Sequence, residues 1–119
     1  MSLLNTPLLG LLSRALDLTA QRQALVSQNI ANVDTPGYHT RDIDFARELQ
    51  RYVAVDDSVE TPAVREVPGL IDRPDGNNVD IDRESLLMAT NQLQFQTEIA
   101  LLRSEFNRLQ AAINGGGGQ

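Results

Sequence analysis

The chain has 119 residues and a net charge of −6, and it contains no cysteine and no lysine. Its length leaves room for one domain, and the absence of cysteine excludes disulfides, thiolate catalysis and cysteine-based metal sites. Its ten basic residues, all arginine, form no cluster that could neutralise phosphates, so nucleic acid is excluded as a partner.

The first apolar residues lack the basic segment that opens a secretory signal peptide. The apolar run Leu8–Leu12 is too short to span a bilayer. These features predict a chain with no cleavable signal peptide and no membrane insertion. They leave open the export routes that need no such signal.

Residues 7–33 are predicted to form the first long helix. Thr6 is suited to be its N-cap, and Pro7 fits the first helical position, where a missing N–H costs nothing. Apolar residues then follow at alternating spacings of four and three, which is a heptad seam, and a second seam runs beside it. Two seams exceed what one partner helix needs, so the helix is expected in a small bundle or between subunits. The seam residues expected to carry subunit contacts here are Leu8, Leu11, Leu18, Leu25, Val26 and Ile30.

A tight turn is predicted at Thr35-Pro36-Gly37-Tyr38. Pro36 presets φ for the second position of a type II turn, and Gly37 accepts the positive φ of the third. Pro36 also restricts the residue before it, so the helix should end by Val33 or Asp34. Asn32 is a residue that tolerates the left-handed conformation of a helix cap.

Residues 39–78 carry little helical periodicity apart from a short predicted helix at Phe45–Val53. Val53, Val55, Val64 and Val67 are typical of strands, although three prolines limit any strand to short pieces. A turn is expected at Pro74-Asp75-Gly76. Such a long connection is unusual within a compact domain, so we expect it to lie on a neighbouring molecule.

Oxygen-bearing side chains are dense between Asp75 and Glu84 and suggest calcium. However, the glycine and the terminal glutamate that an EF-hand loop requires are missing at their positions. The preferred reading is a turn followed by Asp80 or Asp82 as a helix N-cap, with no metal and no cofactor. His39, near Asp42 and Asp44, is the single histidine, and no nucleophile or phosphate loop accompanies it, so no catalytic residue is expected.

The last helix is predicted from about residue 80 to residue 114, with the same alternating spacing as the first. A stripe of mostly small residues, which includes Leu86 and Leu93, runs beside its seam. The glycine run after residue 114 is expected to end the helix and leave a flexible tail. The seam residues expected to contact other subunits are Met88, Phe95, Ile99, Leu102, Phe106 and Leu109.

Together these elements predict a mainly α protein. Its long terminal helices pair as a coiled-coil-like hairpin, joined by an extended, largely irregular middle region with room for one short β-hairpin. The expected parts are residues 1–33 (first helix), 34–79 (turn and connection), 80–114 (last helix) and 115–119 (tail). Burying one seam offsets the entropy of ordering two such helices only weakly, so they are expected to become firm on polymerisation.

Three stretches carry a resemblance to a known family. Ala31-Asn32, followed after two residues by Thr35-Pro36-Gly37-Tyr38, resembles the N-terminal signature of bacterial flagellar rod, hook and hook–filament junction proteins. Arg41–Phe45, together with Asp75-Gly76-Asn77 and Val79-Asp80, resembles the proximal rod members of that family. The resemblance covers most of both terminal thirds of the chain.

The resemblance implies a non-enzymatic structural subunit whose terminal helices polymerise into the tube that serves as driveshaft and export channel. It implies a place in the basal body, spanning the periplasm, after uncleaved export by the flagellar type III apparatus. The implied partners are further copies of the chain, FlgC-like and FlgF-like rod proteins, a FliE-type adaptor and the MS ring. Two alternatives remain open: another member of the rod family, and a free-standing coiled-coil adaptor, which would explain the heptads but not the turn.

Overall fold

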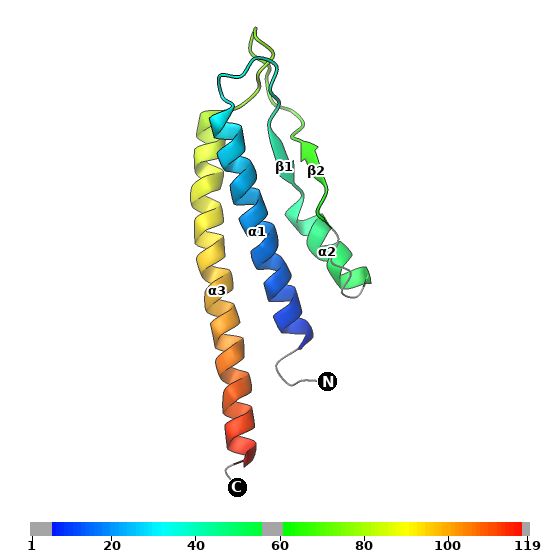
Figure 1. The fold of residues 1–119 in the computed structure, drawn as a ribbon, viewed down its shortest axis with the longest axis vertical. Helices are drawn as coiled ribbons and strands as arrows, with labels where there is room; N and C mark the ends of the chain where they lie inside the picture. The colour runs from blue at the N-terminus through cyan, green and yellow to red at the C-terminus, as the bar shows by residue number, and fades with distance from the viewer. Residues whose placement is uncertain (1–5, 56–60, 118–119) are drawn as a thin grey trace.

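A computed structural model of the chain describes residues 6–55 and 61–117. Two long antiparallel helices lie side by side, and a two-stranded sheet with a short helix covers the other side of the first (Figure 1). The molecule is elongated, 71 × 27 × 18 Å. This arrangement confirms the predicted mainly α fold. In chain order the elements are α1 Pro7–Ala31, β1 Arg41–Ile43, α2 Phe45–Val55, β2 Val64–Glu66 and α3 Ile81–Gly117.

The start of α1 has the predicted chemistry. The Thr6 hydroxyl accepts a hydrogen bond from the Leu9 N–H at 3.2 Å, and Pro7 occupies the first turn. The helix ends at Ala31, and its C-cap Asn32 has φ −102°, so the left-handed cap that Asn32 would tolerate is not formed. The Asn32 N–H still donates to the carbonyls of Gln28 and Asn29, which leaves no need for a left-handed residue at this point.

The middle of the chain folds back onto α1 of the same molecule. Ile43 at the end of β1 packs with Leu18 and Leu25 of α1, and Phe45 and Leu49 of α2 cover this cluster. The prediction that this connection lies on a neighbouring molecule is therefore wrong. A helical period confined to the eleven residues of α2 is a weak signal in the sequence, but it is enough to place one apolar face on α1.

The sheet is short and antiparallel, with Arg41 opposite Glu66 and Ile43 opposite Val64. It supplies the small β element that the sequence allowed, although α2 lies between its strands in the chain. Of the valines expected in strands, Val64 lies in β2, whereas Val53 and Val55 lie in α2.

The two ends of α3 differ in how well the sequence predicted them. At the start, the Asp80 carboxylate accepts from the Arg83 N–H at 3.2 Å, which confirms Asp80 as N-cap. At the other end, α3 stays helical to Gly117, so the tail predicted from residue 115 is wrong up to that residue; residues 118–119 lie outside the described range. A glycine costs about 1 kcal/mol relative to alanine, and extending an existing helix is easier than starting one.

The face that α3 presents to α1 is strongly polar. Its buried side chains include Glu84, Asn91 and Glu98, which are seven residues apart. The Thr19 hydroxyl of α1 donates to the Glu98 carboxylate at 2.8 Å, and the Gln23 amide donates to the Met88 carbonyl at 3.3 Å. A heptad repeat therefore joins the two helices, but at these positions it is a repeat of polar residues.

We expect Leu18→Ala to lower the free energy of unfolding by about 3 kcal/mol, because Leu18 is 0% exposed at the centre of the core cluster. Leu8→Ala makes the same change on the same helix, but Leu8 is 46% exposed, so its cost should stay below about 1 kcal/mol. Urea unfolding of both variants measures the difference. Equal losses would contradict the packing of β1 and α2 on α1.

Candidate functional site

The candidate site is the tip of the molecule, where the end of α1, the two connecting loops and the start of α3 meet (Figure 1). We use "tip" for residues 29–42 and 72–84. Two segments thirty residues apart in the sequence lie against each other here, and hydrogen bonds between polar groups join them.

The first half of the tip is the predicted turn. The Tyr38 N–H donates to the Thr35 carbonyl at 3.2 Å, and Gly37 has φ +74°. Both features confirm a type II turn with glycine at its third position. The Thr35 hydroxyl also donates to the Asn32 side-chain oxygen at 3.0 Å, which ties the turn to the end of α1.

The second half is the turn predicted around Asp75, and it packs against the first. The Gly76 N–H donates to the Arg73 carbonyl at 2.8 Å, and Gly76 has φ +84°. The Gly37 N–H donates to the Asp75 carbonyl at 2.9 Å. A Cβ on Gly76 would lie 3.3 Å from the Gly37 Cα, so the two glycines let two backbones approach closely.

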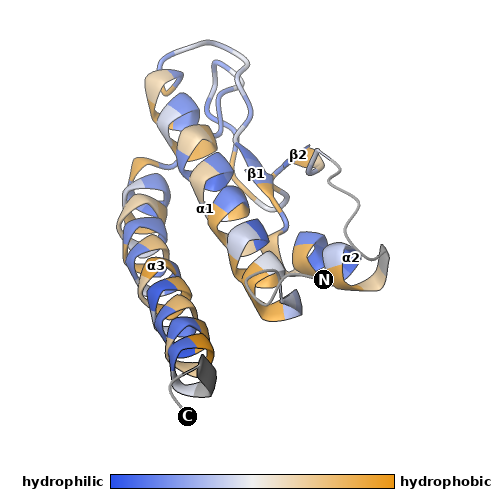
Figure 2. Ribbon diagram, turned by 60° about the horizontal axis from the view of Figure 1, so that its bottom comes forward, coloured by the Kyte–Doolittle hydropathy of each residue, from blue (hydrophilic) through white to orange (hydrophobic). Residues whose placement is uncertain are grey.

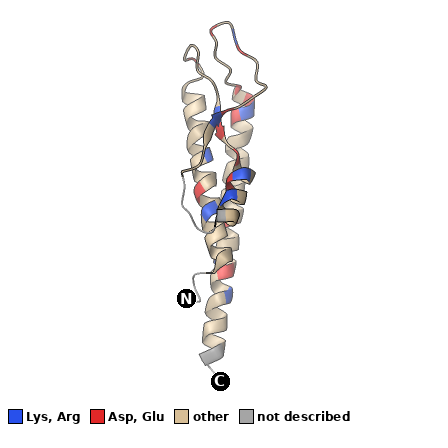
Figure 3. Ribbon diagram, turned by 90° about the vertical axis from the view of Figure 1, so that its right-hand side faces the viewer, with Lys and Arg blue, Asp and Glu red and all other residues tan. Residues whose placement is uncertain are grey.

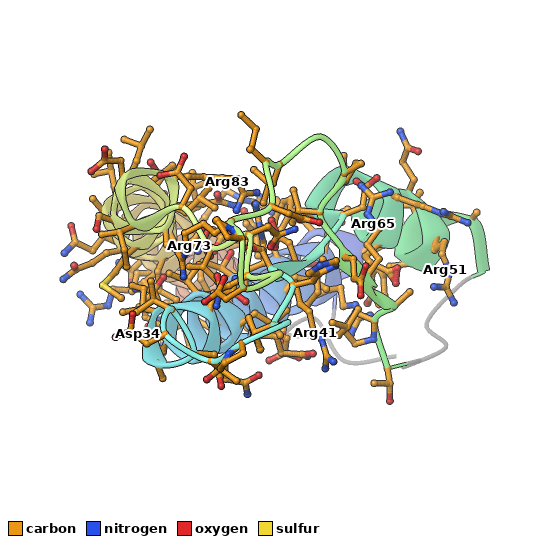
Figure 4. The ribbon with its side chains drawn as sticks, turned by 90° about the horizontal axis from the view of Figure 1, so that it is seen from above. Asp34, Arg41, Arg51, Arg65, Arg73 and Arg83 are labelled. Carbon is orange, nitrogen blue, oxygen red and sulfur yellow. The ribbon has the colours of Figure 1, made fainter. Side chains whose placement is uncertain are left out.

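Side chains of the second loop take over the carbonyls that follow α1. The Asn77 amide donates at 2.8 Å to the carbonyls of both Asn32 and Thr35. The Arg73 guanidinium donates to the Val33 carbonyl, and Figure 4 shows Arg73 between α1 and α3. A loop forty residues away in the sequence is thus hydrogen-bonded to the backbone that directly follows α1. The sequence did not predict this role of Asn77, because an asparagine after a turn can form hydrogen bonds in many different settings and its distant partners are not visible in the sequence.

Asn29, near the end of α1, is the centre of the site and only 1% exposed. Its side-chain N–H₂ donates to the Arg41 carbonyl at 2.9 Å and to the Glu84 carboxylate. Its oxygen accepts from the Tyr38 hydroxyl at 2.8 Å and from the Arg41 N–H at 3.1 Å. One amide therefore joins α1, the signature turn, β1 and α3, with all its donors and both acceptor positions used.

Ion pairs surround this amide and balance the charge of its partner, the Glu84 carboxylate. Glu84 is fully buried and pairs with Arg83, which also lies 3.7 Å from Asp42. Asp42 receives two bonds of 2.9 Å from Arg22 of α1, a bidentate pair of the stronger kind. Two carboxylates thus meet two guanidinium groups, which makes burial of Glu84 tolerable.

The Tyr38 phenol is held in its protonated form. Burial raises its pKa above the usual value and the Glu84 carboxylate raises it further, whereas the Arg41 guanidinium opposes them. A protonated phenol is what the hydrogen bond to Asn29 requires, because the hydroxyl is the donor. Tyr38 is therefore a structural link between the turn and α1.

His39 has carboxylate neighbours, but they differ from those near it in the sequence. Its ring nitrogens lie 3.3 Å from Glu66 and 3.7 Å from Asp72, while Asp42 pairs with Arg22 and Asp44 with Arg65. The hydrogen bond to Glu66 raises the pKa of His39, and Asp72 adds to the effect. Within residues 6–55 and 61–117, no three His, Asp or Glu side chains are grouped to hold a metal ion.

The predicted seam residues divide between the two helices. On α1 the subunit's own fold buries half of them, namely Leu18, Leu25 and Val26, whereas Leu8 is exposed and Leu11 and Ile30 are half-buried. On α3, Leu109 is buried, Met88, Ile99 and Leu102 are half-buried, and Phe95 and Phe106 are exposed. Further exposed apolar residues of α3, of which sequence reasoning made no site, are Leu86, Leu93, Leu101 and Ile113.

Hydrophobic segments occur along the whole of α3 in Figure 2, and charges gather near the tip and α2 in Figure 3. Residues 85–97 contain no charged residue. Among the helices that the structure describes, none combines the length and the apolar content that crossing a bilayer requires.

Comparison with known proteins identifies relatives over most of the chain. The family model described as "Flagella basal body rod protein" matches residues 11–39, which run from α1 through the signature turn. The flagellar basal body rod protein FlgB of Salmonella typhimurium is 39% identical, over 86% of this chain and 89% of its own. The FlgB protein of Escherichia coli is 37% identical to this chain, over 86% of this chain and 89% of its own. The FlgB protein of Aeromonas hydrophila is 31% identical, over 89% of this chain and 92% of its own.

Asn29→Ala should lower the free energy of unfolding by about 3 kcal/mol, because it leaves the buried Glu84 carboxylate and the Tyr38 hydroxyl without their shared partner. Gln28→Ala, on the exposed side of the same turn of helix, should change it by less than about 0.5 kcal/mol. Chemical denaturation measures both. A mild Asn29→Ala would show that the network does not hold the tip together.

Gly37→Ala and Gly76→Ala impose similar backbone strain, about 1–2 kcal/mol, because both positions have positive φ. The space around them differs: a Cβ on Gly37 meets nothing within 4 Å, whereas one on Gly76 meets the Gly37 backbone. Gly76→Ala should therefore be the more destabilising by about 1 kcal/mol or more in the same denaturation assay. Identical losses would mean that the two turns do not pack as described.

Proposed function

The chain belongs to the FlgB family of flagellar basal body rod proteins, and from this we propose that it polymerises through its terminal helices into the tubular proximal rod. It is a structural subunit of the basal-body rod. In the proposed assembly, paired α1 and α3 helices line a tube that carries torque and lets exported chains pass. We propose no catalytic role.

The observation that carries this proposal is the surplus of apolar side chains on α3. Leu86 and Leu93 are 68% and 65% exposed, although a lone subunit would gain from covering them. The α1-facing side of α3 instead holds Glu84, Asn91 and Glu98. A helix with polar residues toward its partner and apolar residues outward is suited to packing against other subunits.

In such a tube the tip would hold α1 and α3 in a fixed position relative to each other. Its hydrogen bonds fix how α1 leaves the helix pair and how α3 enters it. The two helices can then be presented to neighbouring subunits as one unit of fixed register. The signature residues Ala31, Asn32, Thr35, Pro36, Gly37 and Tyr38 would act through this geometry, with direct contact to other subunits limited to their exposed side chains.

Partners and location follow from the same family. The proposed neighbours are further copies of the chain, FlgC-like and FlgF-like rod proteins, a FliE-type adaptor and the MS ring. We propose that the chain reaches the periplasm-spanning rod through the flagellar type III export apparatus without cleavage of a signal peptide. Relatives matched over 86% of the chain favour a rod protein over a free-standing coiled-coil adaptor.

Incorporation into purified basal bodies tests the proposal, with Phe95→Asp as the decisive variant. Phe95 is 37% exposed in the free subunit, so a charge there should leave the fold intact. Burying that charge between subunits would be costly, so incorporation and motility should be lost while export continues. Gln96→Asp adds the same charge at the adjacent exposed position and should be tolerated. Normal motility of Phe95→Asp, or absence of the unaltered chain from the rod, would contradict the proposal.

A further inference from the structure

An open groove runs between α1 and α3 below the tip, with a volume of about 390 Å³. Small side chains line it on the α1 side: Ala20, Ala24 and Ser27. Gln92 and Phe95 line it on the α3 side. None of the residues that line it is charged, so it suits an apolar, uncharged occupant with projecting side chains.

The wall of the groove holds two polar atoms that lack a hydrogen-bond partner. They are the side-chain N–H₂ of Asn91 and the side-chain oxygen of Gln23, and both are buried. Asn91 as a whole is only 2% exposed. Leaving a buried polar atom unpaired costs about 1–3 kcal/mol, so turning the Asn91 amide toward an acceptor on an occupant of the groove would remove this cost. The groove is therefore more than a stripe of small residues.

The same chain carries a ridge that matches this groove. Leu86 and Leu93 project from α3, and Thr90 and Thr97 lie between and beyond them on the same side. Each threonine hydroxyl donates to the carbonyl four residues earlier, at 2.8 Å for Thr90 and 3.0 Å for Thr97. Their protons are thus in use, and their oxygens remain able to accept a hydrogen bond from a donor such as the Asn91 amide.

The spacing and the position of the ridge fit the groove of another copy. Leu86 and Leu93 are seven residues apart, as are Ala20 and Ser27, which is about 10 Å along either helix. Leu93 and Phe95 point about 160° apart around α3, so ridge and groove lie on opposite flanks. The ridge therefore cannot fill the groove of its own molecule.

We propose that the groove between α1 and α3 receives the Leu86–Leu93 ridge of a second copy of this chain. Large side chains of the ridge would fit between the small residues of α1, as in ridges-into-grooves packing. Because one flank meets the opposite flank, the contact is heterologous and each copy offers a free groove and a free ridge to the next. The contact therefore propagates into a ring or helix. The inference rests on the proposed function and specifies one contact within it.

The absence of cysteine in the chain allows a direct test by disulfide cross-linking. Ala24→Cys marks the groove and Leu93→Cys marks the ridge, and the double variant carries both. Each is produced in place of the native copy in its own bacterium, and basal bodies are purified and oxidised. Gln50→Cys, exposed on α2, replaces Leu93→Cys in a matched control pair with Ala24→Cys.

The double variant should give a ladder of cross-linked species, because every copy can bond both ways. Each single variant should stay monomeric, and the two single variants produced together in one bacterium, so that both enter the same rod, should stop at dimers. The control pair should give no ladder. Where Leu93→Cys prevents incorporation, Thr90→Cys marks the same ridge one turn earlier.

Double-variant subunits found in the rod but cross-linked only to another protein, or not at all, would overturn the inference and leave the proposed function standing. Dimers formed by Leu93→Cys alone would also overturn it, because they require ridge to meet ridge. Absence of the unaltered chain from the rod would instead overturn the proposed function itself.

Discussion

The buried amide of Asn29 is the contact on which the rest of the structure depends. It bonds Tyr38, Arg41 and Glu84, which lie in three segments, and it is satisfied only when all three are in place. Apolar packing between two heptad helices tolerates sliding, since one leucine resembles the next. A buried amide does not tolerate sliding, because a shift of one helix along the other leaves the amide and its partners without hydrogen bonds. The register of α1 against α3 is thus set at one end of the pair.

Using polar residues between α1 and α3 has a consequence for the surface. The pairs Asn29–Glu84 and Thr19–Glu98 occupy positions that apolar residues would otherwise fill. Apolar side chains of α3 then remain on its flanks, where they are exposed in a single subunit. The subunit gives up some stability of its own and keeps the hydrophobic surface that association can bury. The specific pairing of α1 with α3 and the apolar surface of α3 that other subunits can cover thus result from the same placement of polar residues between the two helices.

Local chemistry was predictable from the sequence, and tertiary contacts were not. Thr6 as N-cap, positive φ at Gly37 and the turn at Gly76 depend on a few adjacent residues, so the sequence predicted them correctly. The N-cap of α3 is Asp80, one of the two candidates that the sequence offered. The packing of Ile43 on Leu18 and Leu25 depends on residues far apart in the chain, and the middle region was therefore wrongly expected on another molecule. For α3, apolar periodicity could not distinguish a seam facing α1 from one facing outward, since both repeat every seven residues. The side-chain bonds of Asn77 identify the cap on α1 only once the loops are in contact.

The tip explains why a signature within residues 11–39 is incomplete by itself. That segment brings Asn29, the turn and the carbonyls that follow α1, but their partners Arg73, Asn77 and Glu84 come from the other end of the connection. Gly37 and Gly76 show the same dependence, because each turn has its shape from its own glycine and its position from the other. Closing this contact brings the end of α1 to the start of α3 and so defines the helix pair. The intervening residues need only return the chain to the tip, which is why a helix and a strand pair can lie between the two halves without disturbing it.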